Sequence, residues 1–485
     1  MGLVNGSSSP VVPVGQVFID WVPKSLKTWA IETFGTNDKV VLVLGALIVL
    51  GVVGVAVGVL AMRGARAAAY ALTALVGFIG SWAVLTRPEP TLAKLLPTIV
   101  GTIVSIAVLW FLAPRPASAP VTSDDVVDAE PMGVDRRRFV GGVIGIGSVA
   151  VLAGGIGRIL QQRHDVDDER QSIALPQAAS SPPALPADVE VPLDGMYPFV
   201  TPNADFYRID TALVVPQVSK DSWTLKISGM VDNEMELTFD DLLARPQVER
   251  YVTLSCVSNP IGGDLIGNAL WQGVLLKDVL DEAGVQTGAT QIVSRSGDGW
   301  TAGTPTEIVM DGRDAMLAIA MNGEPLPAAH GYPVRMVVPG LYGYVSATKW
   351  VTEIELTRWE DYDAYWIPRG WSKEGPVKTM SRIDTDRPGA ASGEAIIGGV
   401  AWAVHRGISR VQVRVGEDGE WVDAELGGSP SSDTWVQWMG TISAEPGRKM
   451  VEARAFDGNG DPQTEQKAGV APNGAQGYPR RWVDF

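Results

Sequence analysis

The chain has 485 residues, a formal net charge of −16 and a slightly positive mean hydropathy, so it is too long for one core and combines apolar with acidic segments. Residues 1–160 carry 12 Lys/Arg and 9 Asp/Glu, whereas residues 161–485 carry 27 and 46. The acidic second region excludes a nucleic-acid partner, which needs a basic face. The single cysteine excludes an internal disulfide and a cysteine-ligated iron–sulfur cluster.

Residues 39–160 are predicted to form four transmembrane helices, after an N-terminal segment of residues 1–38. Four uncharged runs each have roughly the 17–25 residues that an α-helix needs to cross a bilayer, and lysine and arginine lie between them. Buried helices of a soluble core are the alternative. Because no run contains histidine, we expect no haem in this bundle and an external electron carrier for any redox chemistry. The runs are Val40–Met62, Ala67–Thr86, Leu95–Pro114 and Phe139–Gly157.

The segment before the fourth run, Asp135–Val140, contains three consecutive arginines. It resembles a twin-arginine export signal, and an ordinary positively charged flank of a membrane span is the alternative. Both interpretations keep Arg136–Arg138 in the cytoplasm and place everything after residue 160 outside it. The sequence therefore predicts a multi-pass protein of the cell membrane with its large C-terminal part on the extracytoplasmic side.

Three regions with different patterns follow the predicted spans. Residues 161–196 are polar and then rich in Ala, Ser and Pro, which predicts a disordered linker. Residues 197–385 mix strand and helix patterns, which predicts an α+β domain. Residues 393–485 contain short alternating strands between turn signals, which is typical of an all-β, immunoglobulin-like sandwich.

Within the α+β domain, the spacing of apolar residues separates strands from helices. Ser222–Met230 alternates as a half-buried strand does, and Trp350–Leu356 is also predicted to be a strand. Leu275–Ala283 and Arg313–Met321 are predicted to be helices. A further strand, Tyr251–Leu254, leads to the single cysteine.

Cys256 follows this strand and precedes a glycine-rich loop. A thiolate at a strand end suits a metal ligand or a nucleophile, and a small buried core residue is the alternative. With only three histidines in the chain, a metal site built from several histidines is disfavoured.

The surroundings of Cys256 resemble the sulfite oxidase superfamily of molybdopterin enzymes, in particular its membrane-anchored bacterial type. The resemblance covers residues 197–485 in order, and several independent motifs make it specific. It implies a molybdopterin domain over residues 197–385, a dimerisation domain over 393–485, molybdenum with one pterin as cofactor, and no haem. The motifs are Leu254–Ala269, Met321–Pro327, His330–Arg335, Val337–Gly340, Ser346–Trp350, Ala401–Trp402, Thr434–Trp435, Ala453–Asp457 and Asn473–Ala475.

The resemblance assigns roles to three residues at the centre of the site. Cys256 matches the single protein ligand of molybdenum, and a soft thiolate suits such a metal. His330 and Arg335 match contacts to the pterin cofactor. An arginine can hold a phosphate through two hydrogen bonds at once.

Four further residues lie in segments where the family contacts its cofactor. Ser346 and Lys349 correspond to a later Ser/Lys pair, with one extra residue between them in this chain. Asp298 lies in Gly297–Trp300, where the family places another cofactor-side residue. In Tyr207–Ala212 this chain departs from the family, whose cofactor-binding histidine is replaced there, and we expect Thr211 of this segment to contact the cofactor.

The sequence departs from sulfite oxidases at positions that bind the substrate in that family. We expect Asp264, Asn268 and Trp371 to lie at the entrance for the substrate. Sulfite oxidases carry an arginine five residues after the cysteine, where this chain has Ile261, and the position of their active-site tyrosine falls at Trp371. A divalent oxyanion needs fixed positive charge. The sequence therefore favours S-oxides and N-oxides over sulfite.

The leading hypothesis is a membrane-anchored molybdopterin oxidoreductase that transfers an oxygen atom to or from a small substrate. The resemblance also implies a homodimer through the C-terminal domain. Two alternatives remain: a hydrolase that uses Cys256 as its nucleophile with His330 as base, and a cofactor-free, membrane-tethered binding module.

Overall fold

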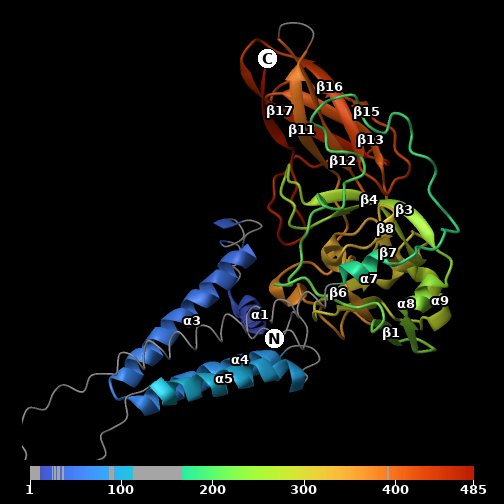
Figure 1. Cartoon of the computed structure of the whole chain (residues 1–485). Helices are drawn as coiled ribbons and strands as arrows, with labels where there is room; N and C mark the ends of the chain where they lie inside the picture. The colour runs from blue at the N-terminus through green and yellow to red at the C-terminus, as the bar shows by residue number, and fades with distance from the viewer. Residues whose placement is uncertain are drawn as a thin grey trace, which may run out of the picture. The chain divides into compact units, whose positions relative to one another are not determined.

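The computed structural model describes residues 11–23, 26, 29, 33–34, 38–86, 92–112, 166–389 and 393–485 (Figure 1). Contacts along the chain divide it into two units. The N-terminal unit contains the apolar helices together with the segment Thr211–Gln217. The C-terminal unit consists of Val166–Asp210 and Val218–Phe485 and contains the large hydrophobic cores.

The N-terminal unit is helical in its described residues. Its main helices are α1 (Val11–Trp21), α3 (Asp38–Met62), α4 (Arg66–Leu85) and α5 (Leu92–Leu112). Three segments are long and apolar enough to cross a membrane: Lys39–Met62, Arg66–Leu85 and Lys94–Phe111. They confirm the first three predicted runs as helices. The fourth predicted run, Phe139–Gly157, and the arginines before it lie outside the described residues.

Small residues allow α4 to pack closely against α5. A Cβ atom added at Gly77 would lie 2.2 Å from Oγ1 of Thr102, so only glycine fits at this contact. Large apolar side chains such as Ile48, Phe78 and Ile103 are instead exposed. Buried small residues and exposed large apolar ones are the pattern of helices that face lipid.

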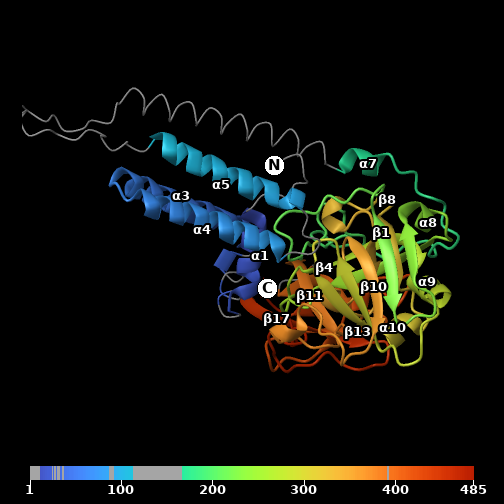
Figure 2. The same cartoon turned by 90° about the horizontal axis from the view of Figure 1, so that it is seen from below.

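The first sheet of the C-terminal unit has five strands in the order β2-β1-β10-β5-β6. The parallel pair β1–β10 can be followed in Figure 2, and the other pairs are antiparallel. The strands are β1 (Thr224–Gly229), β2 (Met235–Thr238), β5 (Gln291–Ser296), β6 (Thr301–Pro305) and β10 (Val351–Thr357).

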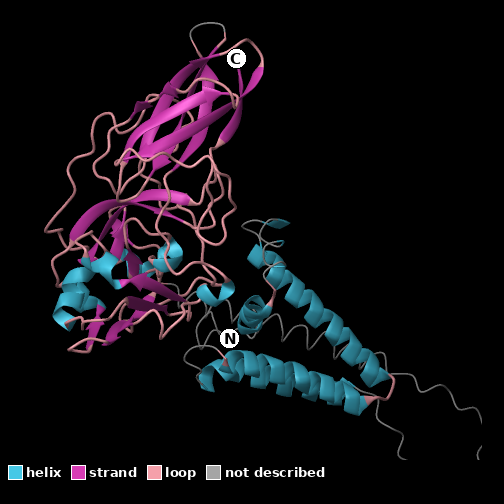
Figure 3. Ribbon diagram, turned by 180° about the vertical axis from the view of Figure 1, so that it is seen from behind, coloured by secondary structure: helices cyan, strands magenta, loops and turns pink. Residues whose placement is uncertain are grey.

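The second sheet has the order β3-β4-β7-β8, and β9 also pairs with β7. Its strands are β3 (Val248–Ser255), β4 (Ile266–Leu275), β7 (Met316–Met321), β8 (Glu324–Pro325) and β9 (Arg335–Val337). Three short helices accompany the two sheets: α8 (Phe239–Leu243), α9 (Leu276–Ala283) and α10 (Thr306–Met310). Residues 197–385 thus contain the predicted mixture of helices and strands (Figure 3).

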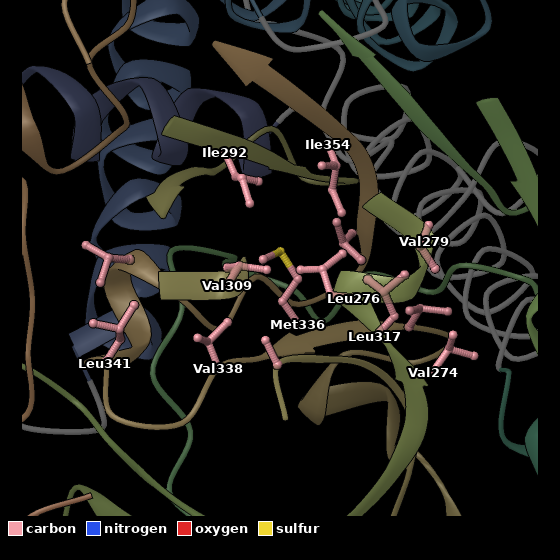
Figure 4. Close-up of a cluster of buried hydrophobic side chains, with 14 of the residues drawn as sticks. Val274, Leu276, Val279, Ile292, Val309, Leu317, Met336, Val338, Leu341 and Ile354 are labelled. Carbon is pink, nitrogen blue, oxygen red and sulfur yellow. The ribbon is translucent and has the colours of Figure 1, made fainter. Parts of the chain in front are cut away.

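One hydrophobic core joins both sheets to the helices. Figure 4 shows Ile292 and Ile354 of the first sheet in the same cluster as Val274 and Leu317 of the second sheet, with Val279 of α9 beside them. All five side chains are at most 2% exposed. The two sheets are therefore held in a fixed relation by apolar packing.

The prediction that Arg313–Met321 is a helix is wrong, because Met316–Met321 forms strand β7. Every residue of β7 is buried, and the strand lies between β4 and the pair of β8 and β9. A strand that is buried on both faces shows a continuous apolar run in place of alternation, which periodicity alone does not distinguish from a buried helix.

The described part of the predicted linker, from Val166 to residue 196, is packed against the C-terminal unit and differs from the disordered segment expected over residues 161–196. The short helix α7 (Asp167–Gln171) contributes Glu169, whose carboxylate accepts a hydrogen bond from Oη of Tyr332 at 2.6 Å. The carbonyl of Pro176 accepts another from a side chain of β4. The Ala/Pro composition excludes regular secondary structure but still permits such individual contacts.

The last part of the chain forms two four-stranded sheets, β11-β12-β16-β15 and β14-β13-β17-β18. They enclose a shared core that includes Ile397, Val413, Trp438 and Ala453. This confirms an all-β C-terminal domain. The strands are β11 (Met380–Pro388), β12 (Glu394–Trp402), β13 (Ile408–Val415), β14 (Val422–Asp423), β15 (Glu425–Leu426), β16 (Val436–Ser443), β17 (Arg448–Asp457) and β18 (Arg480–Asp484).

The close approach of β4 and β7 gives a test of this architecture. A Cβ atom at Gly273 would lie 2.1 Å from the carbonyl oxygen of Leu317, at the register shift between the two strands. We expect Gly273→Ala to reduce the free energy of unfolding by about 1–3 kcal/mol, because backbone must move to relieve the clash. Thermal unfolding of the purified full chain, followed by tryptophan fluorescence, measures the loss. Gly469→Ala is the control, since nothing lies within 4 Å of its added Cβ; equal stability of both variants would contradict the prediction.

Candidate functional site

Cys256 occupies the first position of the loop that joins β3 to β4. Its own N–H donates to the carbonyl of Leu265 at 2.9 Å, and its carbonyl accepts from the N–H of Asn259 at 3.0 Å. The Asn259 side chain closes the loop further by accepting from the N–H of Leu265 at 3.0 Å. The cysteine is therefore held at the neck of a hydrogen-bonded hairpin loop, as a fixed ligand requires.

Burial and nearby positive groups act on the Cys256 thiol in opposite directions. The residue is 8% exposed, and burial raises the pKa of the thiol. The N–H of Ser258, 3.4 Å from Sγ, and the charge of Lys349 favour the thiolate and oppose this rise. The sulfur thus lies in a buried position with stabilisation available for negative charge.

His330 ends a short 3₁₀ turn, Ala328–His330, and its imidazole is fixed by one hydrogen bond. Nε2 lies 3.0 Å from the carbonyl oxygen of Asn203. Because a carbonyl can only accept, Nε2 carries the proton and Nδ1 is the unprotonated nitrogen. Burial, and then the charges of Arg335 and Lys349, lower the pKa of His330 to about 4, so the ring is neutral at neutral pH.

Arg335 begins β9 and carries a buried guanidinium. One nitrogen donates to the carbonyl of His330 at 3.0 Å, and the guanidinium carbon lies 4.8 Å from the centre of the Trp271 ring. Burial lowers the pKa of Arg335 to about 10, so the group remains charged at neutral pH. Turn and strand therefore place His330 and Arg335 beside each other.

Lys349 is also buried and approaches the same turn. Its Nζ donates to Asp210 at 2.5 Å and to the carbonyl of Ala329 at 3.2 Å. Burial lowers the pKa of Lys349 to about 8, against the opposing effect of Asp210. The charges of Arg335 and Arg208 lower it further, which shows that these cations lie within electrostatic reach of one another.

Arg208, Arg335 and Lys349 together form what we term the cationic cluster. One carboxylate, Asp210, pairs with two of its members, Arg208 at 2.8 Å and Lys349 at 2.5 Å. Asp210 thus pairs with two of the three cations, and Arg335 and Lys349 are almost fully buried. Like charges in such a place are unfavourable unless an anionic group balances them, so the arrangement is suited to binding a phosphate or a similar anion.

Three further cofactor-side predictions have different local settings. Ser346 is completely buried, and its hydroxyl donates within its own turn, to the carbonyl of Tyr342 at 2.9 Å. Asp298 lies in the turn between β5 and β6, where its carboxylate accepts from the N–H of Trp300 at 3.1 Å. Thr211 belongs to the segment that groups with the N-terminal unit. Their contacts to a cofactor stay predictions.

The residues proposed for the substrate side have different local settings. Asp264 is exposed in the Cys256 loop. Trp371 packs against Tyr344 and Trp366, with ring centres 5.9 and 6.0 Å apart. Asn268 is 0% exposed, and its side-chain amide is bonded to Thr253 and to the carbonyl of Phe199. Asn268 is therefore an internal support and not a group that faces an entrance.

Sequence reasoning missed two groups of functional interest. Tyr342 and Tyr207 both lie close enough to Cys256 for the thiolate charge to raise their pKa values, and burial raises the pKa of Tyr342 to about 12. Asn203 orients His330 through its main chain. Tyr207 belongs to the segment in which the sequence departs from the family, so the resemblance does not single it out. A main-chain carbonyl contact such as that of Asn203 leaves no signal in a sequence.

His330 gives a pH dependence whose direction follows from its pKa. The histidine titrates near 6.5 when unfolded and near 4 when folded, so between these values the unfolded chain binds the extra proton. We expect cofactor-free protein to lose stability as pH falls from 6.5 to 4, by up to about 3 kcal/mol from this residue. Urea unfolding at pH 7 and pH 4.5 should show a smaller loss for His330→Gln, which keeps a side-chain N–H. Identical losses in both proteins would contradict the assignment.

Comparison with known proteins places the site in a family. The family described as "Oxidoreductase molybdopterin binding domain" matches residues 212–366. The uncharacterized oxidoreductase YuiH of Bacillus subtilis is 36% identical over 164 residues, which cover 34% of this chain and 79% of YuiH. Mitochondrial sulfite oxidase of Rattus norvegicus is 29% identical, over 56% of this chain and 58% of that protein.

A solved structure shows the same relationship. The crystal structure of the sulfane dehydrogenase SoxCD from Paracoccus pantotrophus has a TM-score of 0.51 and 25% identity, covering 59% of this chain and 82% of that one. The chain spans little more than half the length of the rat enzyme, so the whole-protein activities of such relatives do not transfer with the match. The family match, YuiH and the common fold nevertheless agree, and the chain belongs to the sulfite oxidase superfamily of molybdopterin-dependent oxidoreductases.

Proposed function

We propose that this chain is a membrane-anchored oxidoreductase that uses molybdenum and one pterin to transfer an oxygen atom to or from a small substrate outside the cytoplasm. The observation that carries the proposal is the buried thiol of Cys256 beside the cationic cluster, which has one carboxylate for three cations. A soft ligand and an anion site side by side suit a metal–pterin–phosphate group.

The donor atoms around Cys256 fit a cofactor that brings most of its own metal ligands. Among the described residues, no group of three or more His, Cys, Asp and Glu side chains could hold a metal ion. Cys256 would supply the protein's one ligand, and the dithiolene of the pterin would supply the other sulfurs. The bound cofactor would carry the two-electron oxygen-transfer chemistry, which the chain itself cannot provide.

The cationic cluster would hold the phosphate end of that cofactor. The guanidinium of Arg335 is preorganised by its bond to the carbonyl of His330 and by the ring of Trp271, so little side-chain freedom is lost on binding. Lys349 adds a second buried charge. His330 offers its unprotonated Nδ1 as an acceptor for a pterin N–H. Ser346, Asp298 and Thr211 remain proposed contacts of the same group.

The apolar helices suggest the anchor, and the rest of the cellular arrangement is proposed with it. Three described helices are long and apolar enough to cross a membrane. The arginine triplet before the fourth expected span favours a cytoplasmic position for that end and an extracytoplasmic catalytic part. We propose that an external carrier exchanges electrons with a haem-free enzyme. We also propose that the C-terminal domain is an immunoglobulin-like sandwich through which two chains dimerise.

The substrate is proposed to be an S-oxide or an N-oxide. Ile261 stands five residues after Cys256, where an oxyanion-binding enzyme would place a positive charge. In this structure Ile261 lies against Gly477 of the C-terminal domain and packs on the hydrophobic core. An apolar side chain at this place favours a neutral oxide over a divalent oxyanion.

The geometry gives less support to a cysteine hydrolase. A catalytic pair needs a hydrogen bond between thiol and imidazole, but in the described structure the hydrogen bond to Sγ of Cys256 comes from the N–H of Ser258. Burial also raises the pKa of Cys256, whereas a nucleophilic cysteine needs a lowered one. A cofactor-free binding module would leave the cationic cluster with the carboxylate of Asp210 but without a bound anion.

The metal ligand is tested by removing the thiol. We expect Cys256→Ala protein to retain less than about a tenth of the molybdenum of the unaltered chain, because a single protein ligand anchors the metal. Elemental analysis of detergent-purified protein measures molybdenum per chain. Ser258→Ala is the matched control, since it keeps the main-chain N–H that points at Sγ. Full molybdenum occupancy in Cys256→Ala would refute the ligand assignment, and a metal-free unaltered chain would refute the proposed function.

The anion site is tested separately by removing one buried charge. We expect Arg335→Gln to retain pterin roughly 10- to 100-fold more weakly, which corresponds to the loss of charged hydrogen bonds. Pterin fluorescence after acid oxidation and gel filtration provides the measurement. Arg313→Gln removes another largely buried arginine of the same unit, which is bonded to Asp311, and should keep its pterin. Equal retention by both variants would show that Arg335 does not bind the cofactor.

A further inference from the structure

A buried hydrogen-bond network connects the hairpin that carries Cys256 to the C-terminal domain. Oγ1 of Thr253 accepts from the N–H of Trp435 at 2.8 Å and donates to Oδ1 of Asn268 at 3.0 Å. The N–H of Thr253 donates to the carbonyl of Asp433 at 2.9 Å. Thr253 and Asn268 face each other across β3 and β4, and Trp435 directly precedes β16. The C-terminal domain is thus hydrogen-bonded to this hairpin at Thr253, three residues before the cysteine.

The same network continues into the segment 199–203. Nδ2 of Asn268 and Nε1 of Trp435 both donate to the carbonyl of Phe199, at 2.9 and 3.0 Å. The N–H of Asn268 donates to Oγ1 of Thr201 at 3.1 Å, and the N–H of Thr201 donates to the carbonyl of Asn268 at 2.8 Å. Three pieces of chain, from the hairpin, the C-terminal domain and this segment, therefore meet at one point.

From Thr201 the network reaches the pterin-side histidine. Nδ2 of Asn322 donates to the carbonyl of Thr201 at 2.9 Å and to Oδ1 of Asn203 at 2.8 Å. Asn322 lies in the turn between β7 and β8 with φ of 54°, a conformation that asparagine tolerates. The carbonyl of Asn203 then accepts from Nε2 of His330. Cys256 and His330 are consequently attached to a single run of hydrogen bonds.

Burial makes this network restrictive. Thr253, Asn268, Trp435 and Thr201 are each at most 2% exposed. A buried donor or acceptor that loses its partner cannot turn to water, so each member is confined to one position. A fully satisfied network of this kind specifies geometry, whereas apolar packing alone tolerates small shifts.

We propose that Thr253 and Asn268 are positioning residues through which the C-terminal domain sets the place of Cys256 relative to His330. The inference rests on the proposed role of Cys256 as metal ligand. It gives the C-terminal domain a part in each chain's own site, independent of any dimer. The hydroxyl of Thr253 is the critical atom, because it is at once the acceptor for the C-terminal domain and the donor to the opposite strand.

The test replaces this hydroxyl without changing the size of the side chain. Thr253→Val removes both hydrogen bonds, and Thr253→Ser keeps the hydroxyl while losing a methyl group. Gln412→Met is the control for a general loss of buried polar contacts, since Gln412 is 8% exposed and bonds Asp423 and Arg454 within the C-terminal sheet. All variants are made in the full chain, purified in detergent and compared at equal molybdenum content.

Two readouts separate positioning from stability. The electron paramagnetic resonance spectrum of partly reduced protein reports the metal–sulfur geometry, and we expect shifted g values for Thr253→Val only. In protein from a host without the cofactor, alkylation of the single cysteine by iodoacetamide should become roughly tenfold faster in Thr253→Val, since local opening becomes easier. Thr253→Ser and Gln412→Met should match the unaltered chain in both readouts.

The outcomes distinguish this inference from the proposed function. An unaltered chain without molybdenum would overturn the proposed function, while the alkylation rates would still report on the network. An unaltered chain with molybdenum, combined with unchanged spectra and alkylation rates in Thr253→Val, would overturn the positioning role. Equal changes in Thr253→Val and Gln412→Met would show general destabilisation and would also overturn it.

Discussion

The C-terminal unit is organised around a concentration of buried positive charge. Arg335 and Lys349 are both nearly removed from solvent, and Asp210 is the carboxylate that faces the cluster. Much of the surrounding fold stabilises these cations by dipoles and rings: the carbonyls of His330 and Ala329 accept their hydrogen bonds, and the rings of Trp271 and Trp350 lie beneath them at 4.8 Å. The anion of the proposed cofactor would complete this balance of charge.

The thiol and the cluster reach one place from separate parts of the chain. Cys256 comes from the hairpin of β3 and β4, whereas His330 comes from the turn before β9 and Arg335 from the start of β9. Their relative position depends on the shared core of both sheets and on the network through Asn268 and Thr201. Apolar packing supplies most of the stabilisation, and the polar network fixes the register within it.

Much of this could be predicted from the sequence, and the failures share a physical cause. Cys256 follows its strand as the local pattern predicts, whereas His330 and Arg335 were singled out by the resemblance to the family, and one turn brings them together. The three described apolar helices followed from the length of the uncharged runs in the sequence. In contrast, β7 is buried by partners distant in sequence, which removed its alternation. The ion pair of Lys349 with Asp210 joins residues 139 positions apart, and Asn268 is bonded to Thr201 and Phe199, 67 and 69 positions earlier in the chain. Such long-range contacts leave no periodic signal in a single sequence.

The short helix α7 links the first described residues of this unit to the turn that carries His330. Its Glu169 accepts hydrogen bonds from Ser219, from the N–H of Lys220 and from Tyr332, which lies two residues after His330. The chain between the apolar helices and this unit enters the described fold at Val166, one residue before the helix. Glu169 therefore ties the first described residues of this unit both to a surface loop and to the turn that carries His330. A single carboxylate thus couples the order of the segment that begins at Val166 to the order of the histidine turn.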